Sequence, residues 1–205
     1  MSRKETKVWL EKDQVKTLER SCGRLKDKCI IELGAWAGLR ANEIAKAKVK
    51  DLREYSVDST IQHFLYIEGK KTDQEKGQEL KKEREAFIPE RVYSDLRMLV
   101  NQERLADEDP LIPNKFGDHY TSDGIRQRVY TISKNAYEQS EDPDFEKVSS
   151  HDLRRFFAHY NLEEQGKNPR VIMSVGGWKS WDAIKPYLNK PSRKSIVREL
   201  GEKEG

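Results

Sequence analysis

Residues 151–160 read HDLRRFFAHY, and residues 176–188 read GGWKSWDAIKPYL. The first stretch places its apolar and aromatic side chains at the spacing of one helix face, i, i+3, i+4 and i+7: Leu153, Phe156, Phe157 and Tyr160. Ser149 and Asp152 stand at the start of this pattern with the spacing of a capping box, which marks a helix N-terminus. We therefore predict a helix over 150–165 that packs this stripe into the core.

The opposite side of the same helix carries a basic pair. At 100° per residue, His151 and Arg154 lie next to each other and away from the core stripe. Two basic side chains near a helix N-terminus suit a phosphate, because backbone N–H groups and the helix dipole favour anions there. Taken alone, such a pair is more often an ordinary solvated surface, and Arg155 is a rival for the role of the arginine.

Tyr187 is the candidate nucleophile. A tyrosine downstream of a basic helix and of a hydrogen-bond donor such as Trp178 suggests attack on a phosphate, because arginines can supply the positive charge that a metal would otherwise bring. A free tyrosine is almost fully protonated at pH 7. It therefore needs positive neighbours or must lose its proton during the attack. Three other tyrosines are expected to pack in the core or on helix faces: Tyr130, Tyr137 and Tyr160. Trp181 is expected to be a tryptophan of the core.

A second basic feature lies in residues 38–52, GLRANEIAKAKVKDL. Arg40 directly follows an apolar helix, where an arginine is unusual unless it meets an anion. Its guanidinium can grip two phosphate oxygens at once. Glu43 is placed to hold Arg40 in orientation, and the alternative is a surface ion pair of little consequence.

Together these motifs resemble those of the tyrosine recombinases, the phage integrase and Xer family. The C-terminal signature of the family is matched by His151, Arg154, Gly177, Trp178 and Tyr187. Residues 38–52 are similar to its first arginine box, and residues 65–73, LYIEGKKTD, to its lysine-bearing β-hairpin. The three motifs occur in the order of the family and, from about Trp9 onward, cover nearly all of the chain.

The resemblance implies a role for each matching residue. Tyr187 would attack the scissile phosphate and form a 3′-phosphotyrosyl link. Lys71 would protonate the departing 5′ oxygen; Lys70 is the alternative, and Lys71 is preferred because Thr72 follows it, as often occurs in the family. Glu43 would support the phosphate-binding residues, which are expected to be Arg40, His151, Arg154 and Trp178.

The rest of the chain predicts an α+β fold, a mainly helical domain with a small three-stranded antiparallel sheet. Two strands are expected within 51–68 and a third over 84–90, with the charged residues 70–85 serving as a long hairpin loop. Apolar spacing predicts the remaining helices at about 10–22, 25–37, 90–104, 122–139, 169–175, 180–189 and 193–200.

Length and charge fit a single catalytic domain. The 205 residues suffice for one sizeable core, and a net charge of +3 gives only weak support for DNA binding. We expect residues 1–205 to form this domain, with a C-terminal tail at 190–205 that docks on a neighbouring subunit. An N-terminal core-binding domain is expected to be absent, because the arginine box begins at residue 38.

The expected partner is double-stranded DNA, with a homo-tetramer forming on paired sites. The sequence has no Gly-rich phosphate loop and no Asp/Glu metal cluster, so we expect no nucleotide, no metal and no other cofactor. Cys22 and Cys29 are predicted to be reduced thiols, and no apolar run approaches a membrane span, which indicates a cytoplasmic, DNA-associated protein. Two alternatives remain: a type IB topoisomerase, which resembles the family in its nucleophile and arginines, and a catalytically inactive DNA-binding relative.

Overall fold

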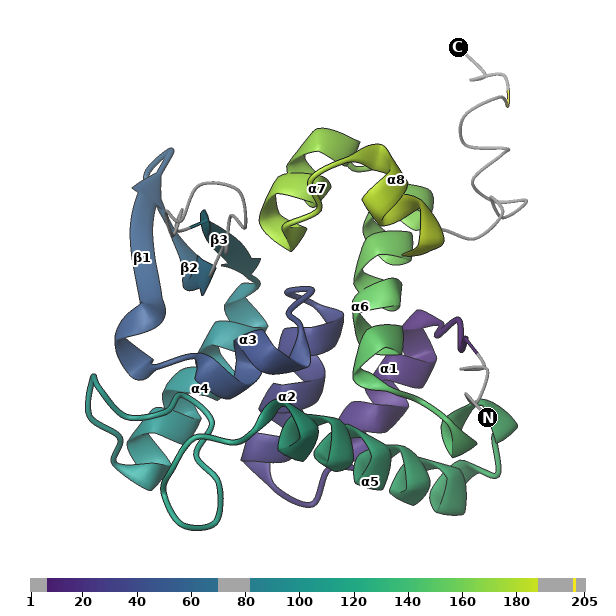
Figure 1. Cartoon of the computed structure of the whole chain (residues 1–205), viewed down its shortest axis with the longest axis horizontal. Helices are drawn as coiled ribbons and strands as arrows, with labels where there is room; N and C mark the ends of the chain where they lie inside the picture. Colours follow the sequence, from purple (N-terminus) through teal and green to yellow (C-terminus); the bar gives the residue numbers. More distant parts are fainter. Residues whose placement is uncertain (1–6, 70–81, 188–200, 202–205) are drawn as a thin grey trace, which may run out of the picture.

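The computed structural model describes residues 7–69, 82–187 and 201, and this part of the chain forms a helical body that carries one small sheet (Figure 1). The helices are α1 (Lys12–Arg20), α2 (Leu25–Ala35), α3 (Ala41–Lys46), α4 (Glu90–Glu103), α5 (Ser122–Ser140), α6 (Ser150–His159), α7 (Pro169–Gly176) and α8 (Trp181–Ile184). The strands are β1 (Leu52–Val57), β2 (Thr60–Gly69) and β3 (Lys82–Ile88), paired antiparallel in the order β1-β2-β3. The predicted fold class is therefore confirmed.

Most predicted elements are confirmed, and the differences lie at their ends. β3 begins earlier than expected, because its antiparallel pairing with β2 extends to Gly69↔Lys82. The helix expected over 150–165 changes at Tyr160 into a π-helical turn. The helix expected over 180–189 is a single short α-helix, α8, followed by a 3-10 turn at Lys185–Tyr187.

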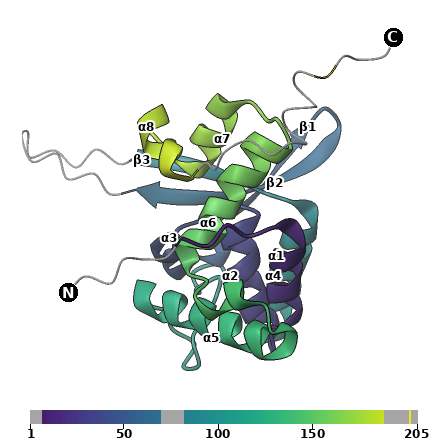
Figure 2. The ribbon, with the colours of Figure 1, turned by 90° about the vertical axis from the view of Figure 1, so that its right-hand side faces the viewer.

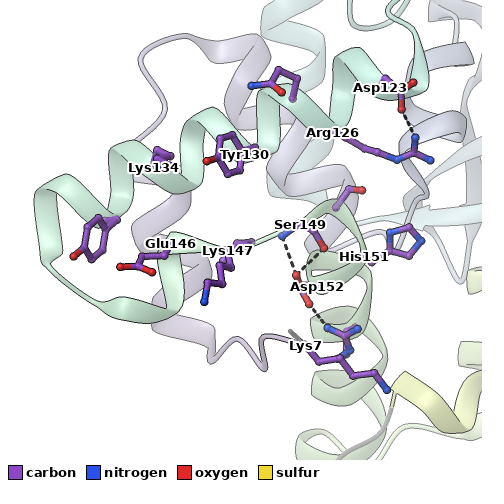
Figure 3. Close-up of a pocket in the computed structure, with 15 residues that line it drawn as sticks. Lys7, Asp123, Arg126, Tyr130, Lys134, Glu146, Lys147, Ser149, His151 and Asp152 are labelled. Atoms are coloured by element: carbon purple, nitrogen blue, oxygen red, sulfur yellow. Dashed lines mark hydrogen bonds and ion pairs between the residues drawn. The ribbon is translucent and has the colours of Figure 1, made fainter. Parts of the chain in front are cut away.

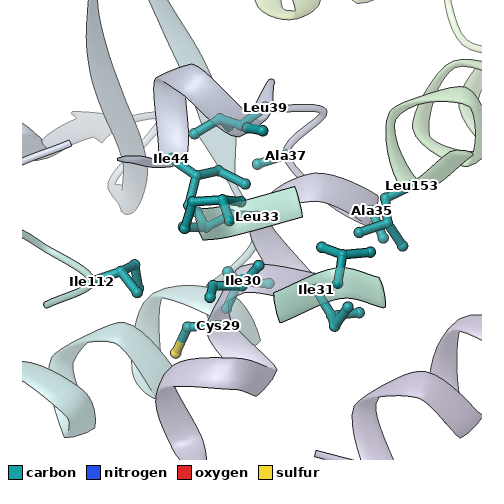
Figure 4. Packing of buried hydrophobic residues seen from close by; sticks show 14 of the residues in the cluster. Cys29, Ile30, Ile31, Leu33, Ala35, Ala37, Leu39, Ile44, Ile112 and Leu153 are labelled. Carbon is teal, nitrogen blue, oxygen red and sulfur yellow. The ribbon is translucent and has the colours of Figure 1, made fainter. Parts of the chain in front are cut away.

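α2 is the central helix of the body, in contact with α1, α4, α5 and α6. Its sequence is apolar along most of its length, and the side chains from Cys29 to Ala35 are buried. The approach to α6 is close: a Cβ on Gly34 would lie 2.9 Å from Cδ1 of Leu153, and Figure 4 shows Leu153 against this part of α2. The predicted core stripe of α6 is thus confirmed for its buried members, Leu153, Phe156 and Phe157.

A smaller apolar cluster attaches the C-terminal segment to α6. Its buried members are Phe157, Ala158, Ile172, Trp178 and Ile184. Figures 1 and 2 show α7 and α8 beside the sheet, at the end of the molecule opposite α5. Trp181 is 50% exposed, whereas Trp178 is 6% exposed. The expectation that Trp181 is the core tryptophan is therefore wrong, because the short α8 turns that side chain outward.

Both cysteines are free thiols, as expected. Burial, reinforced by the carboxylate of Asp27, raises the pKa of Cys22 to about 12. This thiol is therefore protonated and unreactive at neutral pH. Among the described helices, none is long and apolar enough to cross a bilayer.

Glu32 is a carboxyl group enclosed in the middle of α2. Its side chain is fully buried, and its Oε1 lies 2.6 Å from Nη1 of Arg91 and 3.7 Å from Nζ of Lys28. Its Oε2 has no hydrogen-bond partner among the described residues. Burial, together with the nearby carboxylate of Asp95, raises the pKa of Glu32 to about 8.

Glu32→Gln is expected to stabilise the protein at alkaline pH. A carboxyl whose pKa is raised by folding contributes stability that is complete below its unfolded pKa near 4.5 and is lost as the pH rises through 8. Each pKa unit is worth about 1.4 kcal/mol, and about 1 kcal/mol moves Tm by about 2–4 °C at this chain length. Calorimetry should therefore show the Tm advantage of the variant growing by several degrees from pH 5 to pH 9.

Glu108→Gln is the matched control. Hydrogen bonds from Lys50 and Lys48 to the exposed Glu108 lower its pKa to about 2, so the removal of this charge cannot relieve a burial penalty. This control variant should gain no stability as the pH rises. A Tm difference for Glu32→Gln that stays constant with pH would show that Glu32 is ionised in the folded protein throughout this range.

Candidate active site

Arg40 stands at the start of α3, where Glu43 holds it. The preceding turn requires Gly38, which has a φ of +67° and whose missing Cβ leaves room for the ring of Phe157. Glu43 accepts hydrogen bonds from the backbone N–H of Arg40 at 2.7 Å and from its Nη1 at 2.9 Å. The contact expected from the sequence is present, and 44% of the Arg40 side chain remains exposed.

Arg154 is enclosed in the protein rather than displayed on a helix surface. It is only 1% exposed, so the face of α6 that carries it is covered rather than solvated. The last turn of α7 and the ring of Trp178 lie against its guanidinium. Its guanidinium donates to the carbonyl oxygens of Gly38 and, at 2.6 Å, of Gly176. Its Nε has no hydrogen-bond partner within the described part of the chain.

The environment of Arg154 is unfavourable for a cation. Burial, with the charge of Arg40 adding to its effect, lowers the pKa of Arg154. A guanidinium nevertheless stays protonated at neutral pH. Within residues 7–69 and 82–187 no carboxylate forms an ion pair with Arg154, and a buried cation of this kind gains free energy when an anion binds beside it.

Aromatic contacts link Arg154 to Tyr187. The guanidinium carbon of Arg154 lies 3.8 Å from the ring centroid of Trp178, and the Trp178 ring stacks on Phe157. Tyr187 meets Trp178 at an edge, with ring centroids 5.4 Å apart, and its own centroid is 6.0 Å from the same guanidinium carbon. The ring of Trp178 thus positions both the arginine and the tyrosine.

A cavity of about 240 Å³ brings most of the predicted residues together. It is lined by Arg40, Ala41, Asn42, Arg126, Ser150, His151, Arg154 and Tyr187. These side chains come from the start of α3, the start of α5, the first half of α6 and the turn after α8. Trp178 and Glu43 do not line this cavity but contact residues that do.

Arg126 is a cavity residue that the sequence reasoning missed. It lies on α5, far in sequence from every recognised motif, and it pairs with Asp123 one turn earlier. Because α5 carries two other cations, Arg128 and Lys134, no local signal distinguishes Arg126 from them. Only the packing of α5 against α3 and α6 brings it to the cavity.

A larger hollow of about 1110 Å³ adjoins the cavity and shares Arg126, Ser150 and His151 with it. Figure 3 shows α5 on one side of this hollow and the start of α6 on another. Its basic lining residues are Lys7, Arg126, Lys134, Lys147, His151 and Arg155, and its acidic ones are Asp123, Glu146 and Asp152. Two of these acids already pair with arginines of the same wall, so the hollow presents more positive than negative charge.

Arg155 takes a different place from Arg154. It pairs with Asp152 and donates to the carbonyl oxygen of Val8 at 3.2 Å, so it ties the N-terminal segment to α6. Arg154, not Arg155, lines the 240 Å³ cavity. Lys71 and its alternative Lys70 lie outside the described residues, and the role of Lys71 stays a prediction.

Arg84 of β3 is a second residue near the cavity that sequence reasoning missed. Its side chain is 13% exposed, and its Nη2 lies 2.8 Å from Oε2 of Glu43. It also donates to the carbonyl oxygen of Val175 at the end of α7. In the sequence Arg84 falls within the charged stretch 70–85, where its neighbours give no sign that it is buried.

The chain is similar to known proteins along nearly its whole length. The model of the phage integrase family matches residues 8–193. No curated protein sequence matches the chain.

Solved recombinase structures share its fold. The XerA recombinase structure aligns with a TM-score of 0.72 and 18% identity, over 99% of this chain and 66% of that one. The structure of XerH site-specific recombinase bound to its difH substrate aligns with a TM-score of 0.66 and 19% identity, over 97% of this chain and 55% of that one. The Tn1549 transposon integrase in complex with circular intermediate DNA aligns with a TM-score of 0.70 and 19% identity, over 97% of this chain and 67% of that one. The chain therefore spans between about half and two thirds of the length of these proteins.

Proposed function

The chain belongs to the phage integrase family, and on that basis we propose that it is the catalytic domain of a tyrosine recombinase that cleaves and rejoins double-stranded DNA. The observation that carries this proposal is the 240 Å³ cavity, where Tyr187 meets Arg40, His151 and Arg154. A hydroxyl nucleophile beside concentrated positive charge is what substitution at a phosphodiester requires.

The reaction is a substitution at phosphorus. The Oη of Tyr187 releases its proton to water and forms a bond to phosphorus while the bond from phosphorus to the 5′ oxygen breaks. The 3′ end of the DNA is then attached to the protein. Arg40, Arg154 and His151 donate to the non-bridging oxygens, where negative charge increases in the transition state. Lys71 gives a proton to the departing 5′ oxygen. Attack by this or another 5′ hydroxyl on the phosphotyrosine then rejoins a strand.

The geometry supports these assignments in two respects. Arg40 is partly exposed, so it has donors available for a phosphate, and Arg154 lines the same cavity. Trp178 packs on Arg154 and Tyr187, which keeps the nucleophile beside the cation. Orientation of this kind contributes to catalysis because it removes the search for the reactive arrangement.

The larger hollow offers a basic wall to the phosphate backbone of double-stranded DNA. Its basic wall continues from His151 along α5 to Lys134, and phosphate contacts of this kind dominate the affinity of proteins for DNA. The XerH and Tn1549 structures contain DNA, which supports DNA as the partner of this chain too.

We propose further that residues 1–205 act as one catalytic domain and that copies assemble as a homo-tetramer on paired DNA sites in the cytoplasm. The tail at 190–205, with the helix expected over 193–200, lies outside the described residues except Gly201. Its docking on a neighbouring subunit therefore stays a prediction.

A randomised pool of nicked DNA duplexes tests the proposed function. When cleavage next to a nick releases a short strand, rejoining has no partner and the covalent intermediate accumulates. We expect a protein–DNA adduct that resists SDS and forms in excess EDTA, because the cationic side chains supply the charge stabilisation. Sequencing of the attached DNA then identifies the cleavage site.

Each other outcome points to a different conclusion. Loss of the adduct in EDTA with rescue by Mg²⁺ would contradict the proposed chemistry. Relaxation of supercoiled DNA without strand exchange between two duplexes that carry the selected site would favour the topoisomerase. Absence of any adduct would favour an inactive DNA-binding relative.

A further inference from the structure

Arg84 connects three segments that are distant in sequence. It lies on β3, its Nη2 contacts Glu43 of α3 at 2.8 Å, and its Nη1 donates to the carbonyl oxygen of Val175 in the last turn of α7. The side chain is nearly enclosed. A cation buried at such a junction is costly unless its donors are satisfied, so the specific pairing calls for a functional explanation.

The end of α7 is fitted to three arginines at once. Successive carbonyl oxygens of the 175–177 turn accept from different guanidinium groups: Val175 from Arg84, Gly176 from Arg154 at 2.6 Å, and Gly177 from Arg40 at 3.4 Å. Arg154 and Arg40 line the cavity, whereas Arg84 does not.

The two glycines of this turn make the fit possible. Gly177 has a φ of +70°, and a Cβ there would lie 2.6 Å from Nε of Arg84. A Cβ on Gly176 would lie 1.9 Å from Cζ3 of Trp178. A side chain at either position would therefore displace the arginine or the tryptophan that the turn holds.

Glu43 is shared between Arg40 and Arg84. Its Oε1 accepts a hydrogen bond from Nη1 of Arg40 at 2.9 Å. Its Oε2 accepts one from the backbone N–H of Arg40 at 2.7 Å and one from Nη2 of Arg84 at 2.8 Å. Fixed from both sides, this carboxylate cannot rotate away from Arg40. Of the two cavity arginines that the 175–177 turn contacts, Arg40 is far more exposed than Arg154 and has the greater need of such support.

We propose that Arg84 is a positioning residue for phosphoryl transfer, which fixes Glu43 and the 175–177 turn and thereby orients Arg40 and Arg154 toward the scissile phosphate. This inference rests on the proposed recombinase function. It does not require that Arg84 touch DNA.

The electrostatics of Glu43 give the proposal a distinctive consequence. Burial by itself would raise the pKa of Glu43, yet Arg84 on β3, the N–H and charge of Arg40, and Arg154 on α6 together lower it. Arg84 is the largest of the lowering influences. Without it, Glu43 should take up a proton at a higher pH, and a neutral carboxyl would hold Arg40 less firmly.

Arg84→Met removes both the positive charge and the two guanidinium donors, whereas Arg84→Lys keeps the positive charge but not the paired donors. On the selected nicked duplex at saturating concentration, Arg84→Met should slow adduct formation by roughly 10²-fold with little change in DNA affinity, the cost of a misplaced reacting group. Arg84→Lys should recover part of the rate. Arg53→Met is the matched control, because Arg53 pairs with Glu85 at 3.3 Å on the same sheet and neither lines the cavity nor contacts Glu43 or the 175–177 turn in the described part of the chain.

The pH dependence separates positioning from simple loss of structure. The rate of Arg84→Met relative to wild type should fall as the pH is lowered from 8 to 5.5, and adding Glu43→Gln should abolish that fall. A thermal-melt comparison without DNA provides a second readout. The deficit in Tm of Arg84→Met should grow as the pH rises from 4.5 to 7, because a charged Glu43 is then left without its main partner.

The outcomes distinguish the two proposals. A wild-type protein that forms no adduct overturns the recombinase function and this inference with it. A wild-type protein that cleaves while Arg84→Met cleaves equally fast overturns the inference alone. So does a rate loss that is independent of pH and is shared by Arg53→Met.

Discussion

Tyr187→Phe is expected to abolish the covalent protein–DNA adduct while leaving DNA binding nearly intact. The change removes only the hydroxyl, and the ring can still meet Trp178 and the guanidinium of Arg154. Without an oxygen to attack phosphorus, no phosphotyrosyl bond can form. Denaturing gels on the nicked duplex measure the adduct, and a gel shift at the same salt concentration measures binding.

Tyr130→Phe is the matched control for this experiment. Tyr130 is exposed on α5 and lines the larger hollow beside the cavity, so it would approach DNA without reaching the scissile phosphate. It should form the adduct at the wild-type rate. An adduct that persists in Tyr187→Phe would assign the nucleophile to another residue, and its disappearance in Tyr130→Phe would direct the search to α5.

Arg154→Lys should reduce the rate of cleavage by roughly 10²–10³-fold, the cost typical of losing one donor to a developing oxyanion. Lysine retains a positive charge but lacks the planar fork of the guanidinium. In this protein the fork spans the carbonyl oxygens of Gly38 and Gly176. An ammonium group that satisfies fewer of these acceptors should also destabilise the fold by about 1–3 kcal/mol.

Arg155→Lys separates the catalytic loss from the structural one. Arg155 is the adjacent residue on α6 and is 8% exposed. It donates hydrogen bonds to Asp152 and Val8 and does not line the 240 Å³ cavity. The Arg155→Lys variant should be less stable than wild type without a comparable fall in the rate of cleavage. The rates are compared at a temperature below the Tm of both variants. Equal loss of cleavage in both variants would contradict the assignment of the phosphate to Arg154.

The spacing of residues along the chain was enough to predict the elements that bring the site together. Helical periodicity placed α6 and its core stripe, and the capping box at Ser149 and Asp152 is present in the structure. Arg40, His151, Arg154 and Tyr187 were selected from short motifs, and all four line one cavity. The contact of Glu43 with Arg40 follows from a separation of three residues, which brings the two side chains together within one turn.

What the sequence by itself determined was therefore local: the period of the longer helices, the start of α6, and the residue types available for chemistry. Only the tertiary structure decided which faces were covered. It buried Arg154 against the end of α7 and Trp178, exposed Trp181, and brought Arg84 and Arg126 to the site from β3 and α5. The physical reason is that periodicity is set by the backbone hydrogen bonds of neighbouring residues. Burial depends instead on segments far apart in the chain, whose approach no short window of sequence records.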